Sequence, residues 1–212
     1  MTPHNDHYFS QQPQSNARVR EYQFTVGNDT FTVQSDAGLF SSDRLDKGTA
    51  VLLDAYASGK ISLPEKITAD VVDLGCGAGP LTLVLARRYH SATVWAVDVN
   101  ERARSMCAAN ARAHQLSNVK TISPEDIPSA LQISVLWSNP PIRIGKEALH
   151  QLLLTWLNHL APDGIAHFVI SKNLGADSLT TWLTQQGFET KKSASSKGFR
   201  VLSITRRRNL DT

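Results

Sequence analysis

Cysteine is scarce in this chain, with only Cys76 and Cys107 among 212 residues. Two cysteines cannot form the disulfide framework of a small secreted domain, and neither has a second Cys or a His at the spacing of metal ligands. His4 and His7 lie in the polar first segment with no further ligand beside them. We therefore expect a reducing compartment and no bound metal.

Long apolar runs are also missing. No stretch approaches the roughly eighteen consecutive apolar residues of a membrane span, and the opening MTPHNDHYFSQQPQ has neither the basic lead nor the apolar centre of a signal peptide. These absences predict a soluble, cytoplasmic protein with no membrane partner. Hydrophobic residues make up 41% of the chain, which is enough for a sizeable core.

Neither sign of charge dominates, because the net charge is only +3, but the positive charge is concentrated near the C-terminus. A basic segment attracts phosphate backbones, since neutralised phosphates release counterions. The alternative is a solvated segment that keeps the protein soluble. The basic residues of this segment, opposed only by Asp211, are Lys191, Lys192, Lys197, Arg200, Arg206, Arg207 and Arg208.

The composition along the chain indicates one domain after a short lead. Residues 1–20 are polar and mixed, which is typical of a flexible segment. Residues 21–212 are expected to form a single domain, in which residues 21–60 form an elaboration and residues 61–206 form the core of the fold.

The elaboration is predicted to contain a β-hairpin and a helix. Residues 22–26 (YQFTV) and 30–35 (TFTVQS) alternate apolar and polar side chains around a turn that begins at Gly27. Ser42 or Asp43 can then cap a helix.

From residue 70 onward, short apolar strands alternate with helical segments. That alternation predicts a doubly wound α/β fold, in which helices cover both faces of a mainly parallel sheet. The expected strands are 71–75, 93–99, 119–123, 134–139, 165–171, 188–192 and 199–205, and the expected helices are 81–89, 101–114, 146–160 and 178–186.

A glycine-rich turn follows the first of these strands. VVDLGCGAGP, residues 71–80, places Gly75, Gly77 and Gly79 between a buried strand and a helix. Glycines allow the backbone to approach a ligand closely, and a helix N-terminus presents free N–H groups. Asp98 ends the next strand, where a carboxylate commonly accepts hydrogen bonds from ribose hydroxyls. The pattern predicts a nucleotide cofactor, although a tight strand-to-helix turn without a ligand uses glycine as well.

Two details favour one kind of cofactor. The spacing is G-x-G-x-G rather than the G-x-G-x-x-G of dehydrogenases, and Asp73 stands two residues before the first glycine. A carboxylate there would repel the pyrophosphate of a dinucleotide, whereas S-adenosylmethionine carries an ammonium and a sulfonium. The pattern therefore disfavours a nicotinamide-dependent oxidoreductase.

The motifs D-L-G-C-G-A-G, V-D-V-N and N-P-P together resemble the class I S-adenosylmethionine-dependent methyltransferases. That resemblance implies a Rossmann-like, seven-stranded, mainly parallel sheet with an antiparallel closing strand. Within the superfamily the chain resembles the RsmC-type small-subunit (16S) ribosomal RNA guanine-N2 methyltransferases, in their short, single-domain branch. The segments that carry this second resemblance are SDAGLFSSDRLDKGT (35–49), DVNERA (98–103), SNPPIRIGKEALH (138–150) and KGFRVL (197–202).

The family resemblance assigns the cofactor site residue by residue. For the adenine amine, Glu125 is the alternative to Asp126. Asp46 and Thr49 match the family's pattern and are candidates to border the cofactor, with helix capping or a solvent-exposed role as the alternatives. The residues expected to bind the cofactor are Asp73, Gly75, Cys76, Gly77 and Gly79 at the methionine end, Asp98 at the ribose, Val99, Asn100 and Asp126 at the adenine, and Asn139 at the reacting centre.

Asn139 begins an Asn-Pro-Pro loop that cannot be helix or central strand, because proline lacks an N–H and restricts the residue before it. An exocyclic amine is a weak nucleophile, so methyl transfer needs its nitrogen held in line and its hydrogens accepted. We expect the side-chain oxygen of Asn139 and the carbonyl of Pro140 to be these catalytic acceptors. The alternative is a purely structural role for Asn139, because an Asn before Pro often caps a turn through its side chain.

The substrate residues are expected on and around that loop. Related enzymes have an aromatic residue after N-P-P, whereas this chain has Ile142, so Phe40 is a candidate for stacking on the target base. Pro141, the second proline of that loop, is a further candidate for contact with the substrate. Arg143 and Lys146 either contact RNA or are solvated charges at a helix start.

These observations predict an enzyme that methylates N2 of a guanosine in 16S ribosomal RNA, with the small ribosomal subunit as its partner and a monomer as its state. The alternatives are an N-P-P enzyme that acts on another amine, such as a protein glutamine or another RNA base, and a non-catalytic RNA-binding or ribosome-assembly module. The sequence does not specify the target nucleotide.

Overall fold

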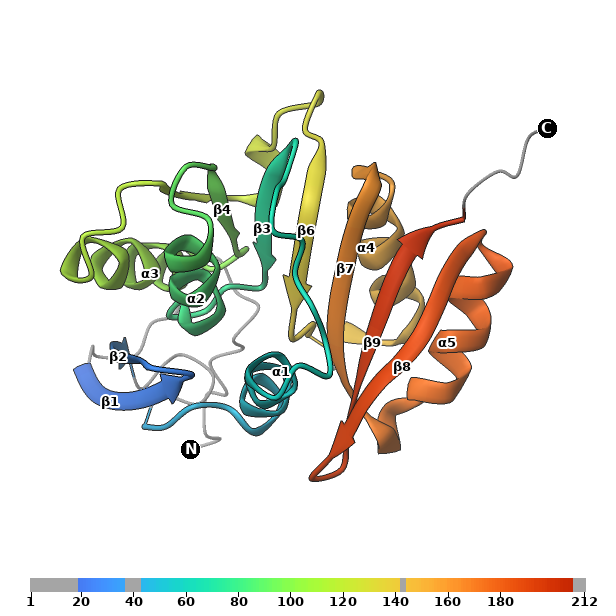
Figure 1. The fold of residues 1–212 in the computed structure, drawn as a ribbon, viewed down its shortest axis with the longest axis horizontal. Coiled ribbons are helices and arrows are strands. Elements are labelled where there is room, and N and C mark those ends of the chain that lie inside the picture. Colours follow the sequence, from blue (N-terminus) through green and yellow to red (C-terminus); the bar gives the residue numbers. More distant parts are fainter. Residues whose placement is uncertain (1–18, 37–42, 142–143, 208–212) are drawn as a thin grey trace, which may run out of the picture.

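The computed structural model describes residues 19–36, 43–141 and 144–207. These residues form two β-sheets together with the helices that pack on them (Figure 1). The strands are β1 (Val19–Val26), β2 (Asp29–Asp36), β3 (Asp70–Leu74), β4 (Val94–Val97), β5 (Val119–Ile122), β6 (Ile133–Ser138), β7 (Leu160–Ser171), β8 (Phe188–Ser196) and β9 (Phe199–Arg206). The helices are α1 (Lys47–Ala57), α2 (Pro80–Arg88), α3 (Glu101–Ala113), α4 (Lys146–Leu157) and α5 (Ala176–Gln185), with short 3-10 turns η1 (Pro124–Asp126) and η3 (Lys172–Leu174).

The larger sheet has seven strands in the order β5-β4-β3-β6-β7-β9-β8. Strands β3 to β7 pair in parallel, and β9 runs antiparallel to both of its neighbours, β7 and β8. Its central strands are buried on both faces; in β6 all six residues are buried. The predicted doubly wound fold with an antiparallel closing strand is confirmed.

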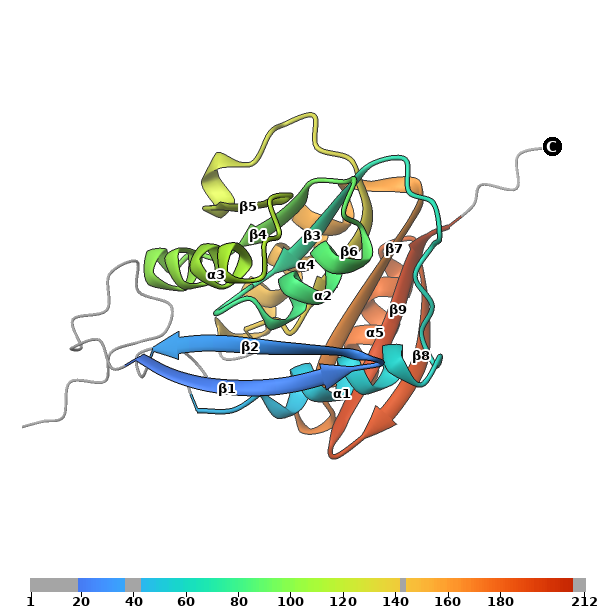
Figure 2. The same ribbon diagram turned by 60° about the vertical axis from the view of Figure 1, so that its left-hand side comes forward.

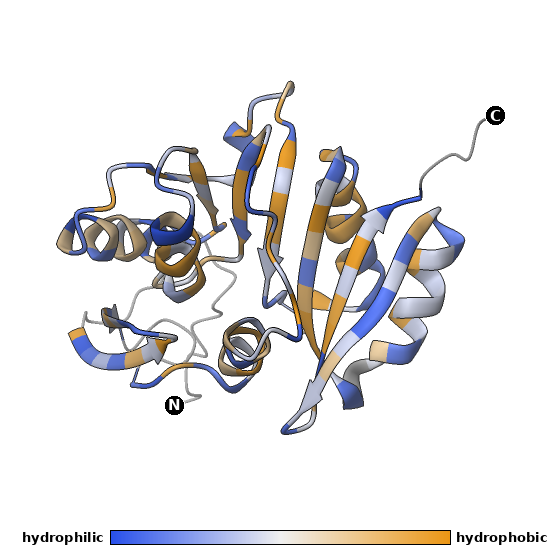
Figure 3. Cartoon of the chain, viewed as in Figure 1, coloured by the Kyte–Doolittle hydropathy of each residue, from blue (hydrophilic) through white to orange (hydrophobic). Residues whose placement is uncertain are grey.

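Helices cover the two faces of this sheet in separate layers. Trp137 and Leu136 are neighbours on β6, and each is fully buried, but they face opposite layers. Trp137 packs in a cluster formed with α1, α2 and the β1–β2 hairpin, whereas Leu136 packs in a cluster formed with α4 and α5. Figure 3 shows hydrophobic residues concentrated on the central strands and on the helix faces turned toward them.

The N-terminal hairpin lies outside the seven-stranded sheet, beside α1 (Figure 2). Phe24 and Phe31 stack across it with ring centroids 5.2 Å apart. The Asn110 side chain on α3 holds its edge, because Oδ1 accepts from Gln34 N at 2.9 Å and Nδ2 donates to Gln34 O at 2.7 Å. Nδ2 of Asn110 also donates to Ala78 O at 2.8 Å, so one amide joins the hairpin to the glycine turn.

Several predicted boundaries were wrong. β1 begins at Val19, inside the expected lead, and α1 begins at Lys47 because Asp46, rather than Ser42 or Asp43, is its N-cap. α4 ends at Leu157, and Leu160, expected to end that helix, is the first residue of β7.

Three other elements also have boundaries that differ from those expected. α5 begins at Ala176 rather than at residue 178, and β8 extends to Ser196 rather than to residue 192. The helix of the glycine turn, α2, begins at Pro80 and ends at Arg88.

Candidate functional site

The site is built where the strand order changes direction. β3 lies between β4 and β6, so the loops that follow β3 and β6 leave the sheet side by side at its carboxyl edge, where open α/β sheets bind ligands. Ser138 Oγ joins the two strand ends by donating to Leu74 O at 2.7 Å. A Cβ added to Gly75 would lie 3.9 Å from the backbone oxygen of Asn139. The glycine turn and the start of the Asn-Pro-Pro loop therefore lie beside each other.

The glycine turn has a shape that only glycine tolerates well. The φ angles of Gly75, Gly77 and Gly79 are 76°, 54° and 91°, all in the left-handed region. At Gly79 a Cβ would also lie 2.6 Å from Cys107 Sγ, so space excludes a side chain there. The turn places the first N–H groups of α2 at the carboxyl edge, where they can meet a polar ligand.

Asp73 is buried at the end of β3 beneath this turn. Thr82 on α2 donates its hydroxyl to Asp73 Oδ2 at 2.5 Å, while Oδ1 has no hydrogen-bond partner among the described residues. Burial raises the pKa of Asp73 to about 7; the hydrogen bonds from Thr82 oppose that rise and the charge of Asp98 adds to it. A buried carboxylate with a free acceptor suits a cationic ligand.

Asp98 and Asn100 order the segment after β4. Asp98 Oδ2 accepts from Gly77 N at 3.0 Å and Oδ1 accepts from Asn100 N at 2.9 Å, so this carboxylate ties the segment to the glycine turn. The Asn100 side chain caps α3 by accepting from Arg102 N at 2.9 Å. Asn100 is fully buried, whereas Val99 is 40% exposed. Of these two adjacent residues, both predicted to flank the adenine, only Val99 has an exposed side chain.

Asp126 and Glu125 lie on η1, just after β5 and therefore at the same carboxyl edge. Both side chains are exposed, so burial does not separate the two candidates for the adenine amine.

Cys76 is 4% exposed within the glycine turn. A hydrogen bond with Cys107 raises the pKa of the Cys76 thiol well above its usual value, and burial raises it further. The thiol therefore stays protonated, which fits a small packed residue rather than a nucleophile.

Asn139 is fixed by the start of α1. Its Nδ2 donates to Asp46 Oδ1 at 2.6 Å and to Thr49 Oγ1 at 3.1 Å. The next residue, Pro140, is buried, and Pro141 is partly buried. This loop is irregular and packed, as the two prolines predict.

The predicted substrate residues are only partly within the described residues. Lys146 is the first residue of α4 and is exposed beside the Asn-Pro-Pro loop in the sequence. Phe40, Ile142 and Arg143 lie outside the described residues.

Three residues that support the site were not found from the sequence: Thr82 beneath Asp73, Asn110 behind the glycine turn and Gly48 beside Asn139. Thr82 and Asn110 sit within ordinary helical patterns and Gly48 is a single glycine, so no local spacing marked them.

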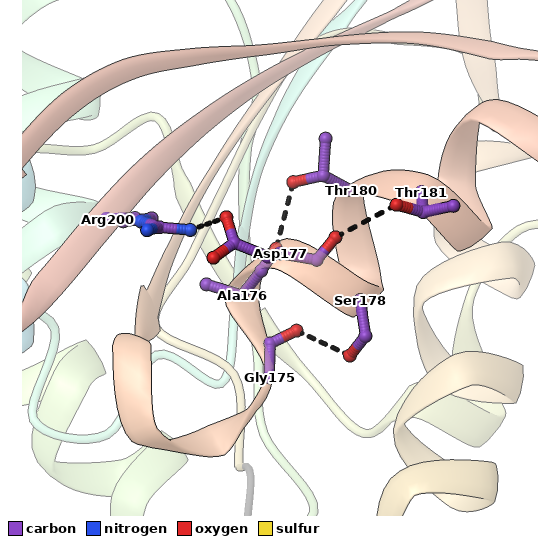
Figure 4. A network of polar contacts seen from close by, with 7 residues as sticks. All are labelled: Gly175, Ala176, Asp177, Ser178, Thr180, Thr181 and Arg200. Carbon is purple, nitrogen blue, oxygen red and sulfur yellow. Dashed lines mark hydrogen bonds and ion pairs between the residues drawn. The ribbon is translucent and has the colours of Figure 1, made fainter.

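The basic C-terminal segment is partly neutralised by ion pairs. Arg200 on β9 pairs with Asp177 at the start of α5, where hydroxyl groups of Ser178, Thr180 and Thr181 bond to helix carbonyls (Figure 4). Lys197 lies 3.6 Å from Asp54 on α1. These two charges of the KGFRVL segment contribute less to any phosphate attraction than their number implies.

Neither a metal centre nor a membrane-spanning helix is present in the described ranges. No group of three or more His, Cys, Asp or Glu side chains there could hold a metal ion. No helix there is long and apolar enough to cross a membrane.

Comparison with known sequences gives one family and a set of relatives. The family model for the methyltransferase small domain matches residues 30–203. The uncharacterized protein YbxB of Bacillus subtilis is 32% identical over 200 residues, which are 93% of this chain and 96% of that protein. The ribosomal RNA small subunit methyltransferases C of Psychromonas ingrahamii and Pseudomonas aeruginosa are 28% and 30% identical over 87% and 92% of this chain. These two matches cover 51% and 57% of the relatives, so the chain spans about half their length.

Comparison with solved structures shows the same fold. The T. thermophilus 16S rRNA N2 G1207 methyltransferase (RsmC), solved with AdoMet and guanosine, matches with a TM-score of 0.74 and 22% identity, over 92% of this chain and 52% of that one. A ribosomal protein L11 methylase from Lactobacillus delbrueckii matches with a TM-score of 0.54 and 19% identity, over 66% of this chain and 71% of that one.

Proposed function

The chain belongs to the methyltransferase small domain family, and from that premise we propose that it transfers a methyl group from S-adenosylmethionine to N2 of a guanosine in 16S ribosomal RNA. The observation that carries this proposal is the position of Asn139. Both hydrogens of its amide face protein oxygens, on Asp46 and Thr49, while the start of the loop lies beside the glycine turn. The amide oxygen thus remains as an acceptor for an amine.

The residues of the glycine turn fit this cofactor. The free Oδ1 of Asp73 provides a buried acceptor for the ammonium of the methionine portion, and the backbone of Gly75 and Gly77 leaves room for a close approach. We assign the ribose to Asp98, one face of the adenine to the exposed apolar side chain of Val99, and the adenine amine to Asp126. When bound, S-adenosylmethionine supplies a methyl carbon whose bond to sulfur breaks as its bond to the amine nitrogen forms, leaving a neutral thioether.

The chain's own residues would raise the reactivity of the amine by position rather than by acid–base chemistry. The lone pair of an exocyclic amine is delocalised into the ring, and it is released for attack when both N–H groups are held out of the ring plane by acceptors. Asn139 Oδ1 and the carbonyl of Pro140 are the two acceptors. The ammonium formed is acidic, so it passes a proton to water and no strong base is needed.

The small-subunit RNA substrate is supported by the relatives and by the surface charge. Two of the relatives bear the name ribosomal RNA small subunit methyltransferase C, and this chain covers about half of each. Lys146 is exposed at the start of α4, where an ammonium can neutralise an RNA phosphate. A guanosine in paired RNA must be turned out of its helix, which costs a few kcal/mol, so an incompletely assembled small subunit is the expected substrate.

The test is methyl transfer by the purified protein from labelled S-adenosylmethionine to small subunits, naked 16S RNA and separated ribosomal proteins. We expect N2-methylguanosine in nucleoside digests of the RNA, and its loss with Asn139→Ala. Label on protein instead would favour the alternative amine substrate. Cofactor binding without any transfer would favour a non-catalytic module, and either result would overturn the proposal.

A further inference from the structure

We propose that Asp46 and Thr49 are positioning residues that hold the Asn139 carboxamide in one orientation, with its oxygen directed to the methyl-accepting amine. The inference rests on the proposed amine methylation. It extends the set of residues that serve the reaction to the first turn of α1, which precedes Asn139 in the chain by 93 residues at Asp46.

The contacts determine which end of the amide faces α1. Asp46 Oδ1 accepts from three N–H groups, those of Gly48 at 2.8 Å, Thr49 at 3.1 Å and Asn139 Nδ2 at 2.6 Å. A carboxylate has acceptor atoms only. If the Asn139 amide were turned over, its oxygen would face the Asp46 oxygen without a hydrogen between them. The NH2 group must therefore point to Asp46.

Thr49 completes the arrangement. Its Oγ1 lies 3.1 Å from the same Nδ2, so the two amide hydrogens have two protein acceptors. With both hydrogens engaged, the amide has only acceptor capacity left. Such a group favours a substrate atom that carries hydrogens, an amine, over a bare ring nitrogen, which would need a donor.

The glycine between Asp46 and Thr49 makes this approach possible. A Cβ on Gly48 would lie 3.1 Å from Asn139 Oδ1 and 3.2 Å from Nδ2, closer than side-chain atoms normally pack. The backbone of Gly48 is not in the left-handed region, so no turn requires glycine there. Glycine in a helix is less favourable than alanine by about 1 kcal/mol. Free space for the Asn139 amide is the reason that the structure supplies for its presence.

The Asp46 charge also acts on the amide electronically. A hydrogen bond from an amide N–H to a carboxylate polarises the amide and increases the negative charge on its oxygen. The hydrogens of the accepting amine become more positive as the nitrogen–carbon bond forms, so the bond to Asn139 Oδ1 strengthens in the transition state. Interactions that strengthen in this way raise kcat with little effect on KM.

The experiment compares Asp46→Asn with the matched control Asp54→Asn, a change of an exposed carboxylate on the same helix. Asn caps helices about as well as Asp, so the unfolding midpoint should hold. The Asn side chain keeps an oxygen that can accept from Asn139 Nδ2 but loses the negative charge that strengthens this bond and polarises the amide. Because a charge-assisted hydrogen bond is about twice as strong as a neutral one, we expect kcat to fall about 10-fold, while the RNA KM and cofactor affinity change less than twofold. Thr49→Val and Gly48→Ala should lower kcat in the same way. A kcat of Asp46→Asn within twofold of wild type would overturn the proposal.

A double-mutant cycle separates positioning from a general structural role. If Asp46 acts through Asn139, Asp46→Asn should cause no further loss of kcat in an Asn139→Ala background. Equal losses in both backgrounds would contradict the proposal.

A measurement without substrate keeps this inference distinct from the proposed function. In nitrogen-15 NMR spectra of the free protein, the side-chain amide protons of Asn139 should exchange slowly with water, and faster in Asp46→Asn and Thr49→Val. Fast exchange in wild type would overturn the fixed orientation even if the enzyme methylates RNA. Slow exchange in a protein that methylates no amine would instead overturn the proposed function and leave the orientation standing.

Discussion

At the residue scale, two buried side chains give the protein opposite responses to pH. Burial raises the pKa of Asp73 to about 7, whereas burial lowers the pKa of His167 to about 4, a shift that a backbone hydrogen bond with Ser62 partly opposes. His167 lies on β7 and its Nδ1 is 2.9 Å from Ser203 Oγ. Because the two shifts have opposite signs, their effects on unfolding partly cancel, and single substitutions are needed to reveal them.

Asp73→Asn should stabilise the protein increasingly as the pH rises. The folded-state pKa is raised, so the stabilisation from protonated Asp73 is complete below the ordinary aspartate pKa of 3.8 and is lost as the pH rises to about 7. The free energy of unfolding of Asp73→Asn relative to wild type should therefore grow across that window, by at most about 4 kcal/mol. Urea unfolding across that pH range measures it.

Asp54→Asn, which changes an exposed carboxylate on α1, is the matched control for that experiment. Asp73→Asn should also weaken binding of S-adenosylmethionine, because it removes the negative charge proposed to meet the ammonium. A constant difference in unfolding free energy at all pH values would show that Asp73 does not titrate in this way.

His167→Gln should reduce the decrease in the free energy of unfolding that acidification causes. The folded-state pKa is lowered, so in wild type the unfolded state binds the additional proton as the pH falls from the ordinary histidine pKa of 6.5 to about 4. Wild type should lose up to about 3 kcal/mol of unfolding free energy through this group, and the variant should not. The exposed His90, changed to Gln, provides the comparison. If the free energy of unfolding fell equally steeply with decreasing pH in His167→Gln and in wild type, the lowered pKa of His167 would be contradicted.

At the element scale, the N-terminal hairpin and the glycine turn are joined through one side chain of α3. Asn110 is 2% exposed and bonds to both backbone groups of Gln34 and to Ala78 O. Arg102, on the same helix, lies 3.6 Å from Asp36 at the end of β2. The hairpin is thus held against the helix that packs behind the glycine turn.

Asn110→Leu, which keeps the size of the side chain, should destabilise the protein by about 2 to 4 kcal/mol. It leaves one buried backbone group, Ala78 O, and two part-buried groups, Gln34 N and O, without their side-chain partner. A buried unsatisfied group costs about 1 to 3 kcal/mol, and less where water enters. Urea unfolding measures the loss, and amide hydrogen exchange at Gln34 should accelerate. Gln23→Leu, at an exposed hydrogen bond across the hairpin, should change stability by less than about 0.5 kcal/mol. Equal effects of the two substitutions would show that Asn110 is not the link.

At the scale of the whole molecule, the proposed substrate should meet the carboxyl edge of the sheet. Lys146→Ala should weaken RNA binding over all sequences and reduce the slope of log affinity against log salt by about 1, because one phosphate contact is lost. Fluorescence anisotropy with a 16S RNA fragment at several salt concentrations measures both. Lys66→Ala, before β3 at the opposite edge of the sheet, should leave the slope unchanged. Binding insensitive to Lys146 would move the RNA surface elsewhere.

The sequence predicted the architecture because its signals are local. A buried strand followed by three glycines, and an apolar run that ends in Asn-Pro-Pro, each determine their own loop, and the strand order then brings the two loops together. The contact between Asp46 and Asn139 spans 93 residues and leaves no mark on local spacing. The end of α4 was missed because the apolar spacing continues from Leu157 to Leu160 although the chain has entered β7.

The place of β9 in the larger sheet affects the order in which the protein can be assembled during translation. β8 is made before β9, but among the described strands it pairs with β9 only, and β9 pairs with β7. The ribosome must therefore release β9 before β8 has a partner. Until then β7 presents an unpaired edge, which is a template for association with other chains. Nascent polypeptides of this protein are consequently most prone to aggregate late in synthesis, when residues 172 to 206 are still emerging.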